Sequence, residues 1–240
     1  MESITVKLAG IVVRLDLTYD ENIQRFSPYV TNDEAEGHLV ISPSRLTAEV
    51  SYLKGNKSVR HISKVDAENN AIYRDLTAFL WDYNILTFHG VFLVKNGQGY
   101  IFTGPSGIGK SFHASLWQKE FGESANVING DKVFLKIQDH TLIGYGTPWM
   151  GKEHIGVNMS NKVHSICRII RGTDNSIKRI ENKQDALGWL LEQSMVKDRQ
   201  FKHLPLIKWF KEAFPAVELY ELTCNQESEA AIIAYNGMKI

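Results

Sequence analysis

The sequence predicts an α/β protein with a mixed, largely antiparallel sheet and flanking helices, preceded by a β-rich N-terminal segment. Three observations lead to this class. Apolar residues alternate with a period of two near the N-terminus, an Asn-Gly pair joins two apolar runs in mid-chain, and segments with helical spacing separate further strand-like runs. The composition, 43% hydrophobic and 22% charged, is typical of a folded globular chain.

The first part of the chain is predicted to form a small antiparallel sheet. Strand-like alternation is present in four segments, which are 4–8, 11–17, 38–41 and Leu46 to Leu53. The first two are separated by Ala9-Gly10, which suits a turn or a bulge. We therefore expect residues 1–85 to be a β-rich segment that ends in one helix.

That helix is indicated by apolar residues at the spacing of one helical face, namely Ile72, Leu76, Phe79, Leu80 and Tyr83. Two strands, Gly90 to Lys95 and Tyr100 to Thr103, follow it and are joined by Asn96-Gly97. Asn and Gly tolerate the positive φ angles of tight hairpins, so these two strands are expected to pair antiparallel.

The remaining pattern predicts a core over residues 86–240, packed as a single globular unit. Helices are expected at Phe112 to Phe121, Gln184 to Met195, Leu204 to Phe214 and Glu227 to Asn236. Strands are expected at Asn126 to Ile128, Lys132 to Ile137, Val163 to Ile170 and Val217 to Leu222, with a Gly-rich loop over 144–149.

Charge and cysteine content exclude several classes of protein. The 27 Lys and Arg balance the 27 Asp and Glu, and a nucleic-acid-binding domain usually has a basic excess. Cys167 and Cys224 have no CxxC partner, so we expect two buried thiols and no zinc or disulfide framework. Since no segment approaches the roughly 20 apolar residues of a membrane span, a cytoplasmic protein without membrane contact is predicted.

A phosphate-binding motif lies between the second hairpin strand and the next helix. It fits G-x-x-x-x-G-K-[ST] and consists of Gly104, Pro105, Ser106, Gly107, Ile108, Gly109, Lys110 and Ser111. Glycines let backbone N–H groups surround a phosphate, and the helix N-terminus adds partial positive charge. Lys110 is expected to reach the β- and γ-phosphates of ATP, with the Ser111 hydroxyl on Mg²⁺. The alternative is a Gly-rich turn that only links strand and helix.

Asp131 is the first candidate carboxylate after this loop. It follows the apolar pair Val127-Ile128 and precedes another strand, so it stands at a strand end from which a side chain can face the phosphates. Phosphoryl transfer needs such carboxylates for the metal and for the acceptor hydroxyl. The alternative, a turn residue in an Asn-Gly-Asp hairpin, is equally compatible with the pattern.

With these features in order, the sequence resembles the C-terminal catalytic domain of HPr kinase/phosphorylase, within the phosphoenolpyruvate carboxykinase-like group of P-loop kinases. The resemblance rests on Phe88-His89-Gly90, the hairpin, the phosphate motif and Asp131, and it covers about Leu86 to Ile170. The stretch from Thr147 to Glu153 is also similar to that of small bacterial kinase-like members found near peptide-modification genes.

The resemblance implies roles for individual residues. Asp131 would be the base that takes the proton of an acceptor hydroxyl, and His89 would position the phosphate or that base. Glu153 would be a second metal ligand beside Ser111 and Asp131, and Lys152 would neutralise charge on the transferring group. Without the family, a hydrogen-bonded structural histidine is the favoured interpretation of His89, and core packing is that of Trp149.

The sequence also departs from the family at two positions. Gly130 replaces the first aspartate of the usual pair, and Phe112 replaces an acidic residue after the loop, so reverse phosphorylase activity is not expected. The N-terminal segment does not look like that of the true HPr enzyme, and HPr is therefore not the expected acceptor.

The predicted function is an ATP- and Mg²⁺-dependent kinase that acts on a Ser or Thr hydroxyl of a peptide or small protein, with a small-molecule hydroxyl as the weaker option. The main alternative is a nucleotide-binding sensor without transfer activity. A carboxykinase acting on a small acid ranks lowest. A homo-oligomer is compatible with the sequence.

Overall fold

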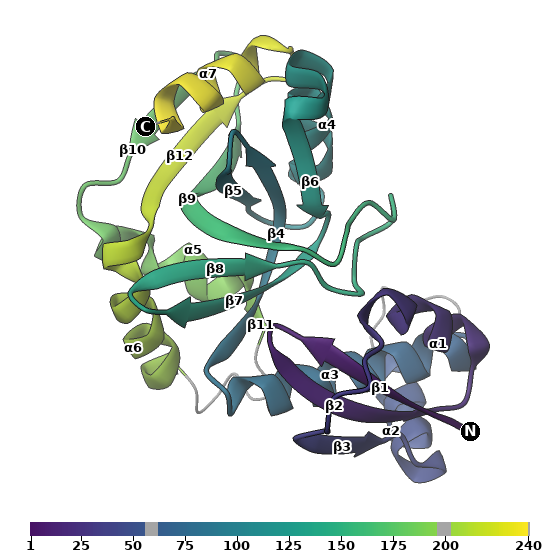
Figure 1. Ribbon diagram of the computed structural model, residues 1–240. Coiled ribbons are helices and arrows are strands. Elements are labelled where there is room, and N and C mark those ends of the chain that lie inside the picture. The colour runs from purple at the N-terminus through teal and green to yellow at the C-terminus, as the bar shows by residue number, and fades with distance from the viewer. Residues whose placement is uncertain (56–61, 196–202, 240) are drawn as a thin grey trace. The chain divides into compact units, whose positions relative to one another are not determined.

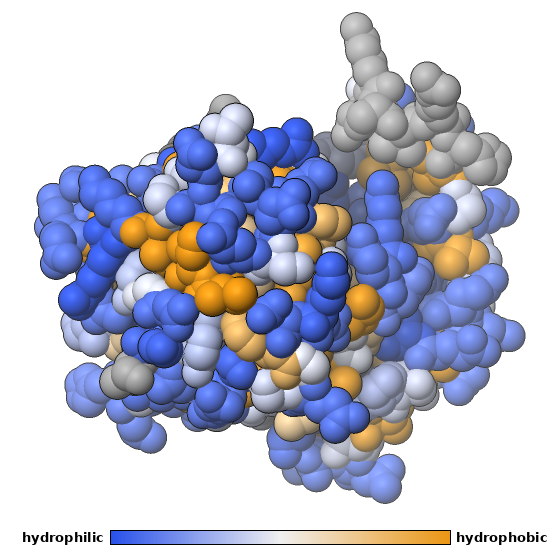
Figure 2. Space-filling model, turned by 90° about the horizontal axis from the view of Figure 1, so that it is seen from above, coloured by the Kyte–Doolittle hydropathy of each residue, from blue (hydrophilic) through white to orange (hydrophobic). Residues whose placement is uncertain are grey.

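The computed structural model describes residues 1–55, 62–195 and 203–239. Contacts divide the chain into two compact units, Met1–Asn84 and Ile85–Ile240. Within the described residues, none of the helices has the length and apolar character needed to span a membrane. Figure 2 shows one face of the molecule, on which hydrophobic residues are exposed in patches among hydrophilic ones.

The first unit contains a three-stranded sheet of β1 (Glu2–Leu8), β2 (Ile11–Leu17) and β3 (Gly37–Val40). β1 and β2 pair antiparallel around the predicted turn, where Ala9 and Gly10 have φ angles of 48° and 86°. β3 runs parallel to β2, so the prediction of a wholly antiparallel sheet is wrong at this strand. The reason is a crossover through α1 (Asp20–Phe26), which the sequence pattern did not indicate.

The predicted strand from Leu46 to Leu53 is also wrong, because these residues lie within helix α2 (Pro43–Lys54). Ser42 caps the helix, as its Oγ accepts a hydrogen bond from the Arg45 N–H at 3.2 Å. Pro43 then occupies the first helical turn, where its missing N–H costs nothing. The Ser-Pro pair is thus a helix start, although it also suits a turn that closes a strand.

The helix predicted from the apolar spacing is confirmed as α3 (Lys64–Trp81), with Ile72, Leu76 and Leu80 buried. Its Glu68 is fully buried and accepts hydrogen bonds from the N–H groups of Thr18 and Tyr19 at 2.8 and 3.2 Å. These bonds place the carboxylate at the start of α1, where the helix dipole stabilises negative charge.

The second unit is built around β4 (Ile85–Lys95), drawn near the middle of the sheet in Figure 1. β4 pairs antiparallel with β5 (Gln98–Thr103) through the predicted Asn-Gly turn. β5 pairs parallel with β9 (Ser160–Arg171), and β12 (Glu218–Cys224) continues the sheet parallel to β9. Parallel and antiparallel neighbours together confirm the predicted mixed α/β class.

The strands of this unit close on themselves. β7 (Lys132–Gln138) pairs with β4 and with β8 (Thr141–Tyr145), and β8 pairs back to the start of β9. The order β4, β5, β9, β8, β7 and again β4 is therefore a closed ring. The first residues of the predicted Gly-rich loop, Gly144 and Tyr145, belong instead to β8. A Cβ at Gly144 would lie 2.8 Å from the Phe92 ring, so only glycine fits where this strand passes the ring.

The segment around Asp131 is not a hairpin. β6 (Ala125–Asn129) and β7 both pair antiparallel with β4, β6 along Phe92–Lys95 and β7 along Ile85–His89. The chain thus runs along β4 in one direction, first as β6 and then as β7, and its pairing with β4 is interrupted at Gly130-Asp131. The alternative that Asp131 is an ordinary hairpin residue is therefore wrong.

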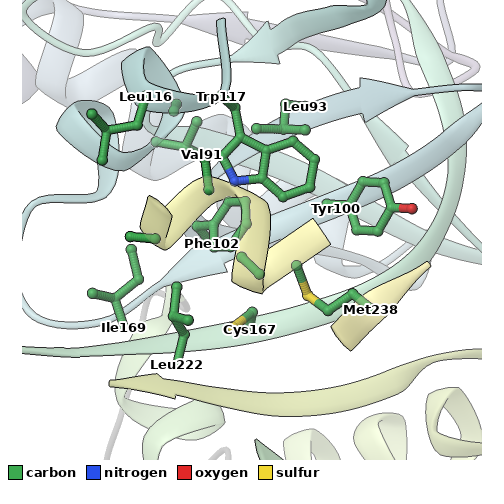
Figure 3. Packing of buried hydrophobic residues seen from close by; sticks show 14 of the residues in the cluster. Val91, Leu93, Tyr100, Phe102, Leu116, Trp117, Cys167, Ile169, Leu222 and Met238 are labelled. Carbon is green, nitrogen blue, oxygen red and sulfur yellow. The ribbon is translucent and has the colours of Figure 1, made fainter. Parts of the chain in front are cut away.

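Helices α4 (Lys110–Phe121) and α7 (Glu229–Met238) pack together and cover one face of the sheet. Figure 3 shows the buried cluster beneath them, in which Trp117 lies among Phe102, Tyr100 and Leu93. Cys167 and Cys224 belong to the same cluster and are free thiols, as predicted. Burial raises the pKa of both, which keeps them protonated.

The predicted helix from Gln184 to Met195 is shorter in the structure. α5 (Leu187–Gln193) ends where Ser194–Met195 pairs with β4 as the short strand β11. The other predicted C-terminal elements are present as α6 (His203–Ala213), β12 and α7. The remaining elements are the edge strand β10 (Ser176–Arg179) and short 3₁₀ helices at Ser27–Tyr29, Gly122–Ser124, Lys183–Ala186 and Phe214–Ala216.

Candidate functional site

The phosphate motif forms a loop between β5 and the first turn of α4, which begins at Lys110 rather than at Phe112. Gly107 and Gly109 have φ angles of 79° and 113°, in the left-handed region that other residues rarely adopt. These angles bring the backbone around to the N-terminus of α4. The first N–H groups of a helix have no intrahelical acceptor and carry partial positive charge, so the loop has the geometry of an anion site.

Lys110 is folded over this loop. Its Nζ donates to the carbonyl oxygens of Gly104 at 3.0 Å and Pro105 at 3.3 Å, and the residue is only 7% exposed. Burial lowers the pKa of Lys110 to about 8, although the nearby Asp131 carboxylate acts in the opposite direction. The ammonium group is therefore poorly solvated and would gain from a bound anion.

Asp131 and His89 are in contact across the break in strand pairing. His89 Nε2 lies 3.2 Å from Asp131 Oδ1, and the Asp131 carbonyl oxygen accepts the Gly90 N–H at 2.9 Å. Lys132 Nζ is 3.3 Å from the same carboxylate oxygen. Burial by itself would raise the pKa of Asp131, but the His89 hydrogen bond and the Lys132 charge outweigh it and leave the pKa below its usual range. The carboxylate is thus ionised at neutral pH.

Gln193, which sequence reasoning missed, fixes the His89 ring from the other side. Its Oε1 lies 2.8 Å from His89 Nδ1, and the residue is buried at the end of α5. The pairing of Ser194 in β11 with Phe88 in β4 holds this helix end beside His89. With an acceptor at each ring nitrogen, a protonated His89 ring can donate to Gln193 and Asp131 at the same time.

The turn that carries Asp131 is braced by Asn129, which is fully buried. Asn129 Oδ1 accepts the N–H groups of Asp131 and Lys132 at 2.9 and 2.8 Å. Its Nδ2 donates to the Thr147 carbonyl at 3.1 Å, and Thr147 Oγ1 donates to the Lys132 carbonyl at 2.7 Å. Both ends of the Asn129 amide are therefore used to hold the position of Asp131.

Position 130 requires glycine for a steric reason. A Cβ there would lie 2.5 Å from the Met150 carbonyl oxygen and 3.1 Å from that of Ile155, so the segment after Trp149 packs directly on the glycine. Neither an aspartate nor any other side chain fits without moving that segment. Gly151 on the same segment lies between Asp131 and Glu153, since a Cβ there would be 3.2 Å from Asp131 Cβ and 3.5 Å from Glu153 Oε2.

These groups face one cavity of about 740 Å³. Besides the loop residues, it is lined by His89, Asp131, Lys132, Gly151, Lys152, Glu153 and Gln193. The predicted residues His89, Lys110, Ser111, Asp131 and Glu153 thus border the same space. Trp149 lies outside it, buried edge-on against Phe134 with ring centroids 6.2 Å apart, as the core-packing interpretation requires.

No group of three or more His, Cys, Asp or Glu side chains suited to a metal ion is present in the described part of the chain. The oxygen groups on the cavity include the Ser111 hydroxyl and the carboxylates of Asp131 and Glu153. Mg²⁺ usually binds proteins through one or two carboxylates and takes its other ligands from phosphates and water. The donor set therefore fits Mg²⁺ that arrives with a phosphate ligand, and does not fit an all-protein metal cage.

Comparisons with known proteins find a structural similarity but no sequence match. The sequence matches no protein-family model and no curated protein. Among solved structures, it is similar to the Hpr(Ser) kinase/phosphatase from Coxiella burnetii, with 13% sequence identity and a TM-score of 0.35. That match covers 63% of this chain and 95% of the other. The similarity is distant, and a fold in any case does not determine an activity.

Proposed function

We propose that this protein is an ATP- and Mg²⁺-dependent kinase that transfers the γ-phosphate to a Ser or Thr hydroxyl of a peptide or small protein. One observation carries the proposal. An anion-binding loop with a buried lysine and an ionised, doubly braced aspartate border the same cavity. A Gly-rich turn that only linked β5 to α4 would need neither a buried lysine nor an ionised aspartate on the same cavity.

In this proposal the loop N–H groups and Lys110 bind the phosphate chain, and Asp131 receives the acceptor hydroxyl. The acceptor oxygen forms a bond to the γ-phosphorus as the bond from that phosphorus to the β,γ-bridging oxygen breaks, which releases ADP. The hydroxyl proton passes to the Asp131 carboxylate. Because its pKa is lowered, Asp131 is a weak base whose main contribution is to orient the hydroxyl. His89 and Gln193 hold that carboxylate in place.

Mg²⁺ would be held by the Ser111 hydroxyl and by the carboxylates of Asp131 and Glu153. Bound there, it would neutralise charge on the phosphates. Lys152, on the same cavity, would add positive charge for the transferring group.

Nucleotide binding tests the first half of the proposal. Titration calorimetry with ATP and Mg²⁺ should show binding to the wild type, weakened about tenfold or more in Lys110→Ala because a charge-assisted contact is lost. Lys119→Ala is the matched control, since Lys119 is an exposed lysine in the last turn of the same helix. Unchanged ATP affinity in a folded Lys110→Ala variant would refute the proposal.

A nucleotide sensor without transfer activity is the second candidate. It is favoured by Gly130, where the packing of Met150 excludes a second carboxylate. The two functions differ in the effect of Asp131→Asn on the transfer of radiolabelled phosphate to a library of Ser- and Thr-containing peptides. A kinase should lose transfer about a hundredfold or more while keeping ATP affinity. Equal, near-zero transfer by wild type and variant would favour the sensor.

A further inference from the structure

A smaller cavity, of about 280 Å³, opens onto the cavity that contains Asp131, and we call it the side pocket. Four residues line both cavities, namely Ser111, Phe112, Gly130 and Glu153. Gly130 directly precedes Asp131 in the chain, and consecutive Cα atoms are only about 3.8 Å apart. The side pocket therefore begins beside the Asp131 carboxylate.

The floor of the side pocket is apolar and rigid. It is formed by Val91 of β4, Ala114 of α4 and Val127 of β6, all of which are buried. These three residues belong to the buried cluster that Figure 3 shows in part. Because close packing in the core holds them in place, the pocket has its shape before a ligand binds.

Two large apolar side chains of the side pocket remain in contact with water. Phe112 at the start of α4 is 46% exposed, and Ile155 on the segment after Trp149 is 42% exposed. A ligand that covered them would remove apolar surface from water, which favours binding. Phe112 is also one of the two positions at which the sequence departs from the family it resembles, so this apolar wall is a feature of the present chain.

The polar groups of the side pocket restrict what can enter it. Glu153, at the junction with the larger cavity, is the one charged residue among the described residues that line the pocket. Ser115 and Gln118 add neutral groups on exposed turns of α4. An acidic side chain would thus be repelled by Glu153 and would find no cation to pair with, whereas a neutral apolar side chain suits the floor and walls.

We propose that the side pocket binds an apolar side chain of the peptide acceptor, within two residues of the Ser or Thr whose hydroxyl lies at Asp131. The inference rests on the proposed kinase function and adds which acceptors are selected. In an extended peptide, residues two positions apart point to the same side and are about 7 Å apart, which suits two adjoining cavities. The favoured acceptor therefore has Leu, Ile, Met or Phe near the hydroxyl residue, and no Asp or Glu at that position.

The test measures transfer of radiolabelled phosphate from ATP to synthetic peptides by the full chain. Each peptide contains one Ser, and each of the two positions on either side of it carries Leu, Ala or Asp in turn. At one of these positions, Leu should raise kcat/KM about tenfold or more over Ala, mainly through KM, because it fills an apolar pocket. Asp at the same position should lower kcat/KM below that of Ala.

Ser115→Phe adds a ring at an exposed position of α4 that lines the side pocket. The ring should fill the pocket and abolish the preference for Leu over Ala, with ATP affinity unchanged. Glu120→Phe is the matched control, because it adds the same ring at an exposed position of the same helix outside the pocket, and it should keep the wild-type preference. Ile155→Ser, which removes an exposed apolar wall, should weaken the preference and provides a second measurement if Ser115→Phe is unstable.

The outcomes separate the side pocket from the proposed function. Transfer without a preference for Leu at any flanking position, or an intact preference in folded Ser115→Phe, overturns the side pocket alone. A wild-type dimer in analytical ultracentrifugation that Ser115→Phe dissociates would show that a second copy of the chain covers the pocket, and would also overturn the inference. Absence of transfer to every peptide, by protein that binds ATP, overturns the proposed kinase function together with it.

Discussion

At the scale of single residues, the buried ammonium group of Lys110 is the part of the site most sensitive to its surroundings. It donates to two carbonyl oxygens of its own loop, and such neutral acceptors do not compensate a full positive charge. A bound phosphate would supply that compensation. Affinity for nucleotide should therefore depend on whether Lys110 already carries its proton.

We predict that ATP affinity falls as the pH rises above about 8, the pKa to which burial lowers Lys110. Below that pH the free protein is already protonated, whereas above it binding must take up a proton, so the dissociation constant rises by up to about tenfold per pH unit. Calorimetry between about pH 7 and about pH 9, in buffers of different ionisation enthalpy, measures both the affinity and the proton uptake.

Lys110→Arg is the control, because arginine keeps its charge throughout this range and should give a flat profile where it still binds. A wild-type affinity that stays constant across the range would contradict the prediction.

The residues of the site differ in how far the sequence could predict them. Gly104 to Ser111 are contiguous, and together they fit a known phosphate-binding pattern. His89 and Asp131 needed the resemblance to a family, because each also suits an ordinary turn or strand position. Gln193 gave no signal, since its partner His89 is 104 positions away and nothing local in the sequence indicates a long-range side-chain contact.

At the scale of elements, the break between β6 and β7 determines where Asp131 lies. β4 is long enough to pair with both strands, so Gly130 and Asp131 span the gap without a reversal of the chain. The segment that follows Trp149 packs onto this break, and the close approach is possible only because residue 130 has no side chain.

We predict that Gly130→Ala destabilises the protein by about 1–3 kcal/mol, because a Cβ 2.5 Å from the Met150 carbonyl forces the backbone to shift. The same shift should move Glu153 and reduce phosphate transfer. Thermal unfolding followed by circular dichroism measures the stability.

Gly188→Ala is the matched control for this substitution. Gly188 lies in α5, and apart from its chain neighbours and the backbone of its own helix no atom lies within 4 Å of where an added Cβ would stand, so alanine there should be neutral or stabilising. The gain from replacing a helical glycine by alanine is about 0.5–1 kcal/mol. Equal melting temperatures for Gly130→Ala and the wild type would show that the segment can move freely.

Two elements were mispredicted for reasons that are physical. The residues from Leu46 to Leu53 include Thr, Val and Tyr, which favour strands, yet the Ser42 cap and the packing of Glu49 and Leu53 select a helix. β8 contains a glycine because it passes the Phe92 ring, and glycine in a sequence ordinarily indicates a loop. In both cases tertiary contacts outweigh local preference.

At the scale of the whole molecule, the mixed sheet could be predicted because the hairpin before the phosphate loop fixes one antiparallel pair. Closure of the ring could not be predicted, since it depends on pairings such as β8 with β9 that only the folded chain brings together. The stability of the second unit also depends on His113, which is buried in α4 behind the phosphate loop.

We predict that acidification destabilises the second unit through His113. Its pKa is about 3 in the folded state and near 6.5 when unfolded, so the unfolded state binds the extra proton between these values. Stability from this residue is therefore complete above about pH 6.5 and lost as the pH falls, by on the order of 2 kcal/mol near pH 4.5. Urea unfolding at several pH values measures the slope.

His113→Phe should flatten this part of the pH dependence, although it removes the acceptor of the Trp117 indole N–H and lowers stability at every pH. Identical pH slopes for variant and wild type would contradict the role of His113.

The closed ring of strands also limits how an acceptor can be recognised. Peptides often bind by adding a strand to the free edge of a sheet. β4, which carries His89, has β5 and β11 on one side and β6 and β7 on the other, and β7, which follows Asp131, lies between β4 and β8. β4 and β7 therefore offer no edge for strand addition, and the outer edges nearest these two residues belong to β6 and β11, each of which pairs only with β4 among the strands that the structure describes. A peptide acceptor that bound by strand addition would thus have to pair with β6 or β11, and one that bound otherwise would have to be selected by side chains and loops around the cavity.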